Sequence, residues 1–168
     1  NLGYSWNFYR TMERCRGEYV AVLDGDDLWT DPLKLKKQID FLENKPEYSL
    51  SFSKYYVCNE DSNLGQVTGF SGKYDLNEVL AGKCPGTRTV VFRRKYLPET
   101  LPGEYDKISY ADHILLALII QHGPVYGIDE PLAAYRMNSE SIYASKTMET
   151  RSLNIIRNYG LMKSVFTD

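Results

Sequence analysis

Residues 18–27 read EYVAVLDGDD, an apolar run that ends directly in a cluster of carboxylates. The apolar part is short and rich in residues that favour strands, which is typical of a strand buried on both faces. Asp24, Asp26 and Asp27 then repel one another unless a cation or a substrate hydroxyl shares their site. Ligands of open α/β sheets bind at the carboxyl ends of strands. The stretch therefore predicts an α/β fold with a ligand site at these three carboxylates.

Sites built from one or two carboxylates suit Mg²⁺ or Mn²⁺ that bridges a diphosphate. The alternative explanation is a solvated acidic turn, in which the aspartates only form the turn. The apolar run before the cluster favours the ligand site. An EF-hand loop starting at Asp24 is excluded, because Leu28, Trp29 and Leu35 stand where an oxygen ligand, a glycine and a glutamate are required.

A phosphatase of the haloacid-dehalogenase type is a second enzymatic interpretation of the same cluster. In that class an Asp-x-Asp motif follows an apolar strand, so Asp24 would be the nucleophile and Asp26 its partner. The class continues the motif with a small residue and Thr or Val, whereas this chain continues with Asp-Leu. Asp129 and Glu130 offer a second acidic pair, so the phosphatase stays open as the alternative.

The remaining sequence predicts alternating helices and strands in a single domain, residues 1–168. Asp75 and Glu78 are typical of a capping box at a helix start. Leu35, Ile39 and Leu42 are expected on one face of their helix. We expect helices at residues 5–16, 32–44, 75–82, 111–121 and 145–165, and strands at residues 18–24, 48–58, 89–93, 125–128 and 132–137, the last two divided by Pro131.

Composition narrows the class of protein. The 168 residues carry 20 Lys and Arg against 22 Asp and Glu, a net charge of −2 that gives no positive field for nucleic acid. The longest apolar run, residues 114–120, is too short to span a membrane. Cys15, Cys58 and Cys84 are scattered, which argues against a disulfide framework and favours a reducing compartment. We therefore expect a cytoplasmic protein, with peripheral attachment to a membrane left open.

The order and spacing of several short motifs resemble the central block of family-2 inverting glycosyltransferases. The motifs of the first part are Asn1-x-Gly3, Asn7, GEYV at residues 17–20, LDGDD at residues 23–27, Trp29, Pro32, Leu35 and Gln38. Those of the second part are TVVFRR at residues 89–94, Ala111-Asp112, Gly123 and Tyr135-Arg136. The resemblance extends to about Ser141. It departs at Met137-Asn138, where the family often has a histidine two places after the Tyr-Arg pair.

The resemblance implies a partial GT-A fold, which is Rossmann-like, with a mixed and mostly parallel sheet flanked by helices. It implies that Asp26 binds Mg²⁺ or Mn²⁺, that Asp24 reaches the ribose of a nucleoside-diphosphate sugar such as a UDP-sugar, and that Asp27 supports or shares the metal. Asp112 matches the catalytic base, which takes the proton of an acceptor hydroxyl in one inverting displacement. Arg136 is a candidate clamp for the diphosphate.

Two of these assignments have structural alternatives. Asp112 could stabilise the N-terminus of its helix instead, and Arg136 could pair with an acid. The resemblance also implies the partners, a nucleotide-sugar donor and a carbohydrate or lipid-linked acceptor. The expected process is the synthesis of cell-surface polysaccharide or glycoconjugate.

The family's N-terminal strands, which hold the nucleotide, have no counterpart in this sequence. We therefore expect strand 18–24 to have one open edge, and an open apolar edge favours pairing with another strand. Pairing with a second copy as a homodimer, or with a further N-terminal segment, would hide it. A domain remnant with a binding or assembly role is the alternative outside the enzymes.

Overall fold

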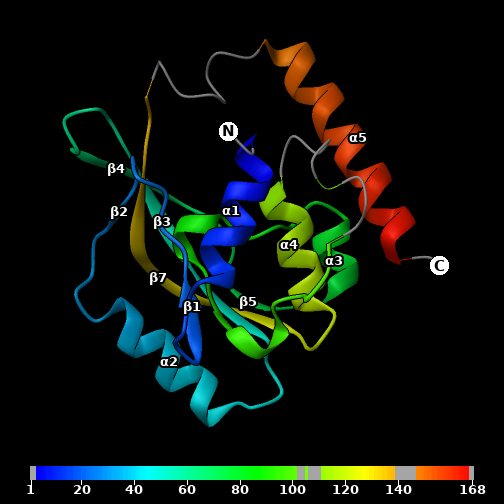
Figure 1. The fold of residues 1–168 in the computed structure, drawn as a ribbon. Helices are drawn as coiled ribbons and strands as arrows, with labels where there is room; N and C mark the ends of the chain where they lie inside the picture. The colour runs from blue at the N-terminus through cyan, green and yellow to red at the C-terminus, as the bar shows by residue number, and fades with distance from the viewer. Residues whose placement is uncertain (1–2, 102–104, 106–110, 139–146, 167–168) are drawn as a thin grey trace.

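The structure is a computed structural model that describes residues 3–101, 105, 111–138 and 147–166. One sheet runs through the molecule and helices cover both of its faces (Figure 1). In chain order the elements are α1 (Gly3–Glu13), β1 (Tyr19–Ala21), β2 (Leu28–Trp29), α2 (Lys34–Asn44), β3 (Leu50–Cys58), β4 (Leu64–Thr68), β5 (Gly72–Tyr74), α3 (Leu76–Leu80), the 3₁₀ helix η1 (Thr87–Thr89), β6 (Val91–Arg93), the 3₁₀ helix η2 (Arg94–Tyr96), α4 (Ala111–Ile120), β7 (Val125–Arg136) and α5 (Met148–Phe166).

The described strands form a mixed sheet in the order β1-β6-β3-β7-β2, with β4 also paired to β3 and β5 to β7. The mixed α/β fold with flanking helices, a partial GT-A arrangement, is therefore confirmed. The expected parallel majority is wrong for the described strands, because only β3 and β7 pair in parallel and five pairings are antiparallel. A short turn joins β3 to β4 and forces them antiparallel, and β6 runs against both of its neighbours.

β1 is shorter and less buried than the sequence predicts. Val20 and Val22 are buried, whereas Tyr19 and Ala21 are half-buried and Leu23 is 42% exposed. Among the described strands β1 pairs only with β6. The expectation of burial on both faces is therefore wrong, because β1 lies at an edge of the sheet.

β7 is one continuous strand, although two strands divided by Pro131 were expected. The register against β3 shifts between Ile128 and Pro131, so Asp129 and Glu130 bulge out as exposed residues. Proline lacks the N–H group that a sheet ladder needs, and a bulge is a position that tolerates this loss. The expected division of the strand at Pro131 is therefore wrong, because the bulge accommodates the proline within one strand.

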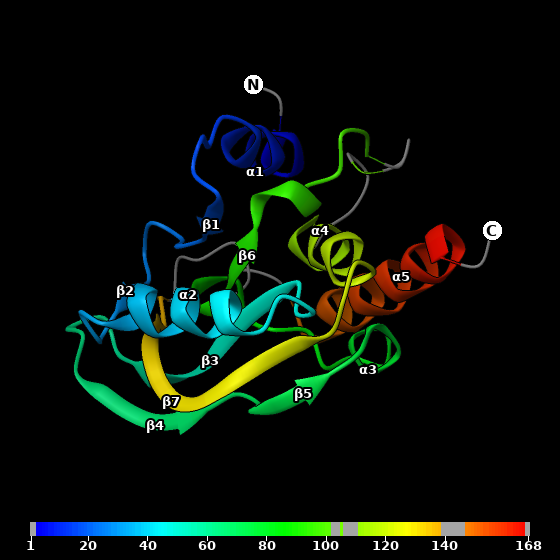
Figure 2. The same cartoon turned by 90° about the horizontal axis from the view of Figure 1, so that it is seen from below.

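The two faces of the sheet are covered by different helices (Figure 2). Leu50, Phe52 and Phe92 point to the face that packs with α1, α3 and α4 in the main hydrophobic core. Successive residues of a strand point to opposite faces, and α2 contacts β3, β6 and β7 from the other side. The core positions α4, whose residues Ala111 and Ile114–Ile120 are all buried.

Two predictions about helix ends can be compared with the structure. The capping box of α3 is confirmed, since the Glu78 N–H donates to the Asp75 carboxylate and the Asp75 N–H donates to the Glu78 carboxylate. α5 begins at Met148, whereas residues 145 and 146 of the expected helix lie outside the described residues. Of the described helices, none is long and apolar enough to cross a membrane.

α2 turns a partly polar row toward the sheet. Lys34, Gln38 and Leu42 are fully buried, whereas Leu35 and Ile39 on the neighbouring side of the helix are only half-buried. Polar residues are accepted at positions that face the sheet when they are hydrogen-bonded.

Gln38 supplies those hydrogen bonds. Its amide nitrogen donates to the carbonyl oxygens of Ser51 at 3.0 Å and Thr89 at 2.9 Å, and its amide oxygen accepts from Lys34 Nζ at 2.6 Å. Lys34 Nζ also lies 4.8 Å from the centre of the Trp29 ring. The row therefore joins α2 to β3, to η1 and to the strand that follows the acidic cluster.

Burial lowers the pKa of Lys34 from 10.5 to about 7. Between these two values the unfolded chain binds a proton that the folded chain lacks, so a rise in pH stabilises the folded state through this group. We expect the free energy of unfolding of the wild type, relative to Lys34→Met, to rise from pH 7 to pH 10 by up to about 1.4 kcal/mol per pH unit. Urea titrations at several pH values measure it. The exposed Lys36→Met on the same helix should show no such trend, and a flat difference for Lys34→Met would contradict the prediction.

Candidate functional site

The acidic cluster forms a tight turn between β1 and β2. The Asp27 N–H donates to the carbonyl oxygen of Asp24 at 3.1 Å, which closes the turn. Leu28 and Trp29 then pair with Ala134 and Ala133 of β7. The carboxylates therefore lie where the end of β1 meets the end of β7.

Asp27 is the buried member of the cluster, at 6% exposure. One carboxylate oxygen accepts from Arg88 Nε in an ion pair, and the other accepts from the backbone N–H of Arg136 at 3.0 Å. Burial raises the pKa of Asp27, and the bonds from Arg88 and Arg136 oppose that rise. Both oxygens of Asp27 are thus already occupied by the protein.

η1 holds the acidic turn from the side. Thr87 Oγ1 donates to the Asp24 carboxylate at 2.8 Å. The Arg88 guanidinium lies between two aromatic rings, 4.9 Å from the centre of Tyr55 and 4.5 Å from that of Tyr135. An arginine stacked on aromatic faces and paired to a buried carboxylate has little freedom to move. η1 therefore fixes the position of two of the three carboxylates.

The Asp26 carboxylate differs from its two neighbours. Within the part of the chain that the structure describes, it makes no hydrogen bond and no ion pair. No three His, Cys, Asp or Glu side chains of the described residues gather so as to hold a metal ion by themselves. A cation at Asp26 would therefore need further oxygen ligands from a substrate or from water.

Asp112 lies in the first turn of α4, and its carboxylate makes no hydrogen bond or ion pair with the described residues. Burial raises the pKa of Tyr4, and the negative charges of Asp112, Asp24 and Asp26 raise it further. The charges of Asp112 and of the acidic turn thus both act on Tyr4. Burial also raises the pKa of Tyr105, and the charge of Asp112 adds to that rise.

Arg136 is the last residue of β7 and adjoins the acidic turn through its backbone bond to Asp27. Its side-chain Nε is buried and finds no hydrogen-bond partner among the described residues. Within the described residues Arg136 forms no ion pair, so its pairing with an acid stays an open alternative.

The structure brings together four of the five predicted site residues, and Asp112 faces the same tyrosine from α4. The sequence did not identify Thr87 as a partner of the cluster or Tyr4 as its neighbour, and it gave Arg88 only a structural or acceptor-facing role. No local signal identifies them, because each is linked to the cluster only by folding.

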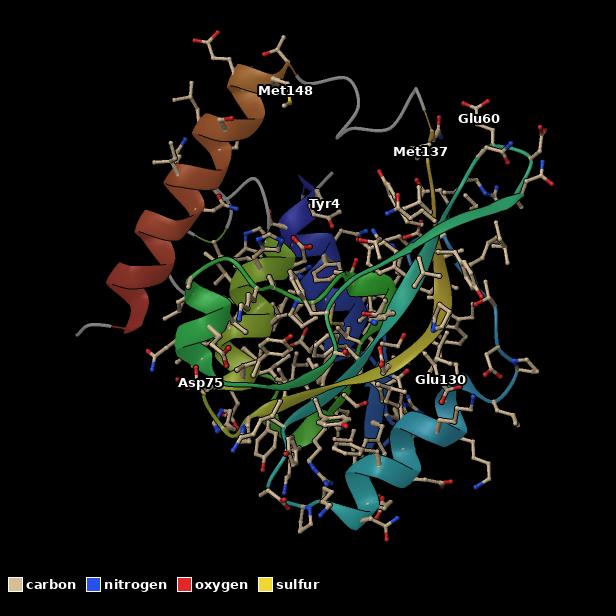
Figure 3. All side chains as sticks on the ribbon, turned by 180° about the vertical axis from the view of Figure 1, so that it is seen from behind. Tyr4, Glu60, Asp75, Glu130, Met137 and Met148 are labelled. Carbon is tan, nitrogen blue, oxygen red and sulfur yellow. The ribbon has the colours of Figure 1, made fainter. Side chains whose placement is uncertain are left out.

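The second acidic pair, which the phosphatase alternative requires, does not join the cluster. Asp129 forms an ion pair with Lys54, and Glu130 forms one with Lys37 at 2.6 Å. Figure 3 shows Glu130 beside α2, away from Tyr4. These acids are solvent-exposed members of surface ion pairs.

A cavity of about 700 Å³ lies at the opposite end of β1 from the acidic turn. Its lining mixes acidic and basic side chains, among them Glu13, Arg16, Arg94 and Glu99, which are all exposed. The charges of this cavity offset one another, so we assign no chemistry to it.

The comparisons with known proteins agree on one family. The family model for glycosyl transferase family 2 matches residues 1–101. An uncharacterized protein of Mycobacterium tuberculosis is 32% identical over 164 residues, which are 96% of this chain and 46% of that protein. A putative teichuronic acid biosynthesis glycosyltransferase of Bacillus subtilis is 29% identical over 139 residues, 82% of this chain and 54% of the relative.

A third relative has a more specific name. The UDP-Glc:alpha-D-GlcNAc-diphosphoundecaprenol beta-1,3-glucosyltransferase of Escherichia coli is 26% identical over 142 residues, which are 83% of this chain and 54% of that enzyme. The chain thus spans about half the length of the curated relatives that it matches. The match to the model of glycosyl transferase family 2 excludes the interpretation of the acidic cluster as a phosphatase site.

We expect Arg88→Met to lower the free energy of unfolding at pH 7 by about 3–5 kcal/mol, because it leaves the buried Asp27 carboxylate without its cation. The loss should shrink at pH 5. Without Arg88 the pKa of Asp27 rises further, and a raised carboxyl pKa favours the folded state at low pH and not above that pKa. Urea titration at both pH values measures this. The exposed Arg10→Met should change the stability by less than about 0.5 kcal/mol, and equal losses in the two variants would contradict the role of Arg88.

Proposed function

The chain belongs to glycosyl transferase family 2, and from this premise we propose that the protein containing it transfers a sugar from a nucleoside-diphosphate sugar to an acceptor hydroxyl. The transfer inverts the anomeric configuration and requires Mg²⁺ or Mn²⁺. One observation carries the proposal: Asp26 and Asp112, from distant parts of the chain, are both unpaired among the described residues and both act on Tyr4.

The acidic turn is the donor end of the site in this proposal. Asp26 binds the divalent ion, whose charge offsets the charge that develops on the leaving diphosphate. Mg²⁺ takes one or two carboxylates and completes its shell with substrate phosphates and water, which fits a turn with one unpaired carboxylate. Asp24 accepts from the donor ribose on the side not used by Thr87. We propose Asp27 as a support of the turn rather than a ligand, since both of its oxygens are occupied.

Arg136 binds the diphosphate in this proposal. A guanidinium donates paired hydrogen bonds to phosphate oxygens, and the buried Nε of Arg136 has no partner among the described residues. The backbone of the same residue holds Asp27, so Arg136 and the acidic turn, whose Asp26 would hold the divalent ion, adjoin at one strand end.

Asp112 is the general base. As the acceptor oxygen bonds to the anomeric carbon, the bond from that carbon to the diphosphate breaks, and the hydroxyl proton passes to Asp112. A base must lie within hydrogen-bond reach of this proton, and a half-buried carboxylate in the first turn of α4 that is unpaired among the described residues can accept it. A single displacement with no covalent intermediate inverts the configuration.

The names of the relatives guide the proposal of substrates. We propose a UDP-sugar as donor and a carbohydrate or lipid-linked acceptor, in the synthesis of a surface polysaccharide or glycoconjugate. The expectation of a homodimer across β1 stays a prediction, for which the unpaired edge of β1 gives a place. The single-domain organisation of residues 1–168 stays a prediction as well.

We expect Asp26→Ala, in the full-length protein, to abolish the Mn²⁺-dependent binding of UDP that calorimetric titration measures. Its stability should change little, because removal of one of several crowded like charges relieves repulsion. The exposed Asp61→Ala serves as the control and should bind UDP as the wild type does. Normal Mn²⁺–UDP binding by Asp26→Ala, or its unfolding, would exclude Asp26 as the metal ligand.

We expect Asp112→Asn to reduce kcat by about 10²–10⁴-fold, measured as UDP released from the donor in the presence of acceptor, with UDP affinity unchanged. The amide keeps the shape of the carboxylate but accepts no proton. Glu149→Gln, which changes an acid in the first turn of α5, is the matched control and should retain turnover. A rise confined to KM with kcat unchanged would make Asp112 a binding residue instead.

A further inference from the structure

The protein holds the Asp24 carboxylate at one of its two oxygens. Thr87 Oγ1 lies 2.8 Å from Asp24 Oδ2, and the hydroxyl is the donor because a carboxylate only accepts. Asp24 Oδ1 makes no hydrogen bond or ion pair with the residues that the structure describes. Asp24 thus has one oxygen that the protein occupies and one to which a ligand can donate.

The bond from Thr87 fixes the plane of this carboxylate. The last torsion of an aspartate side chain is broad, so a carboxylate without partners turns easily. Thr87 itself has little freedom, because it is β-branched and only 5% exposed. A hydroxyl held in this way sets the direction in which Asp24 Oδ1 points.

The 3₁₀ helix η1, which carries Thr87, is anchored at the next residue. The Arg88 side chain pairs with Asp27, and the Arg88 carbonyl oxygen accepts from Trp29 Nε1 at 3.2 Å. These contacts are made within the protein and need no ligand. The hydroxyl of Thr87 is therefore in place before a ligand binds, which is the preorganisation that a selective site requires.

Docking of η1 does not by itself explain the bond to Asp24. The ion pair between Arg88 and Asp27 already joins η1 to the acidic turn. Asp24 is half-buried, so water can replace the hydroxyl as a partner of its carboxylate. The bond from Thr87 therefore matters more for the orientation of Asp24 than for the attachment of the helix.

The charges of the site indicate which group donates to Asp24 Oδ1. In the proposed sugar transfer, the divalent ion at Asp26 and the side chain of Arg136 take the diphosphate, whereas a second carboxylate repels it. A neutral donor of the same ligand suits Asp24 better. The ribose to which the diphosphate is attached offers hydroxyl groups of this kind, and carboxylates bind ribose hydroxyls in other nucleotide sites.

We propose that Thr87 is a positioning residue of the donor site: its hydroxyl turns Asp24 Oδ1 toward a ribose hydroxyl, so the site prefers a ribonucleotide to a deoxyribonucleotide. This role rests on the proposed function and adds a residue to it. A site that bonds a hydroxyl group rejects the analogue without it, because the polar group of the protein is then left unpaired. The preference for the ribonucleotide therefore reports the orientation of Asp24.

Calorimetric titration of the full-length protein in the presence of Mn²⁺, with UDP, 2′-deoxy-UDP and 3′-deoxy-UDP, tests the proposal. We expect the wild type to bind UDP at least about tenfold more tightly than one of the deoxy analogues. Thr87→Val keeps the shape of the side chain without the hydroxyl, and should lower this ratio to about threefold or less by weakening the binding of UDP. Thr87→Ser keeps the hydroxyl and should stay within about twofold of the wild-type ratio.

Thr89→Val is the matched control. Thr89 Oγ1 donates to the carbonyl oxygen of Gly86 at 2.7 Å within the same helix, and not to Asp24. This variant should keep the wild-type ratio even if urea titration shows that it is less stable. An equal fall of the ratio in Thr87→Val and Thr89→Val would assign the effect to η1 as a whole and overturn the role of Thr87.

Further results would overturn the role of Thr87 in distinct ways. If the wild type binds UDP and both analogues equally, or if Thr87→Val keeps the ratio, Thr87 does not direct Asp24 to the ribose, and the proposed function stands. Equal weakening of all three nucleotides would mean that Asp24 acts through the metal ion, and unfolding of Thr87→Val would make the bond structural. A wild type that binds none of the nucleotides with Mn²⁺ would refute the proposed function, and the role of Thr87 with it.

Discussion

The carboxylate of Asp27 joins three separate parts of the chain. It accepts one bond from Arg88 in η1 and one from the backbone of Arg136 at the end of β7, while its own N–H closes the turn onto Asp24. The acidic turn, η1 and the last residue of β7 therefore keep fixed positions relative to one another. The positions of Asp24, Asp26 and Arg136 depend on this one buried group.

A buried ion pair is a poor source of net stability, because removing two charges from water costs several kcal/mol. The ion pair between Asp27 and Arg88 instead fixes the positions of the segments that it joins. With Asp27 neutralised by Arg88, and Asp24 bonded to Thr87, the Asp26 carboxylate alone of the three makes no hydrogen bond or ion pair within the described residues. The three adjacent aspartates thus differ in whether other residues of the protein bind their carboxylates.

The second half of the site depends on packing rather than on bonds. α4 is buried almost throughout because α1, α3, α5 and the sheet surround it, so its apolar residues fix its axis. Asp112, the one acidic residue of that helix, lies in its first turn. Tyr4, from the first turn of α1, then lies near the carboxylates of both halves.

The roles expected of Asp26 and Asp112 came from the resemblance to the family. Local patterns in the sequence determined the strand before the aspartates, the apolar α4 and the capping box of α3. Each follows from periodicity, capping or neighbouring charges, which act over a few residues. Only the tertiary structure decided which aspartate is free, since the partners of Asp27 lie 61 and 109 residues away. The tertiary structure likewise decided the antiparallel pairings, the inclusion of Pro131 within β7 and which residues of α5 are exposed. These depend on contacts between distant segments, which no local pattern records.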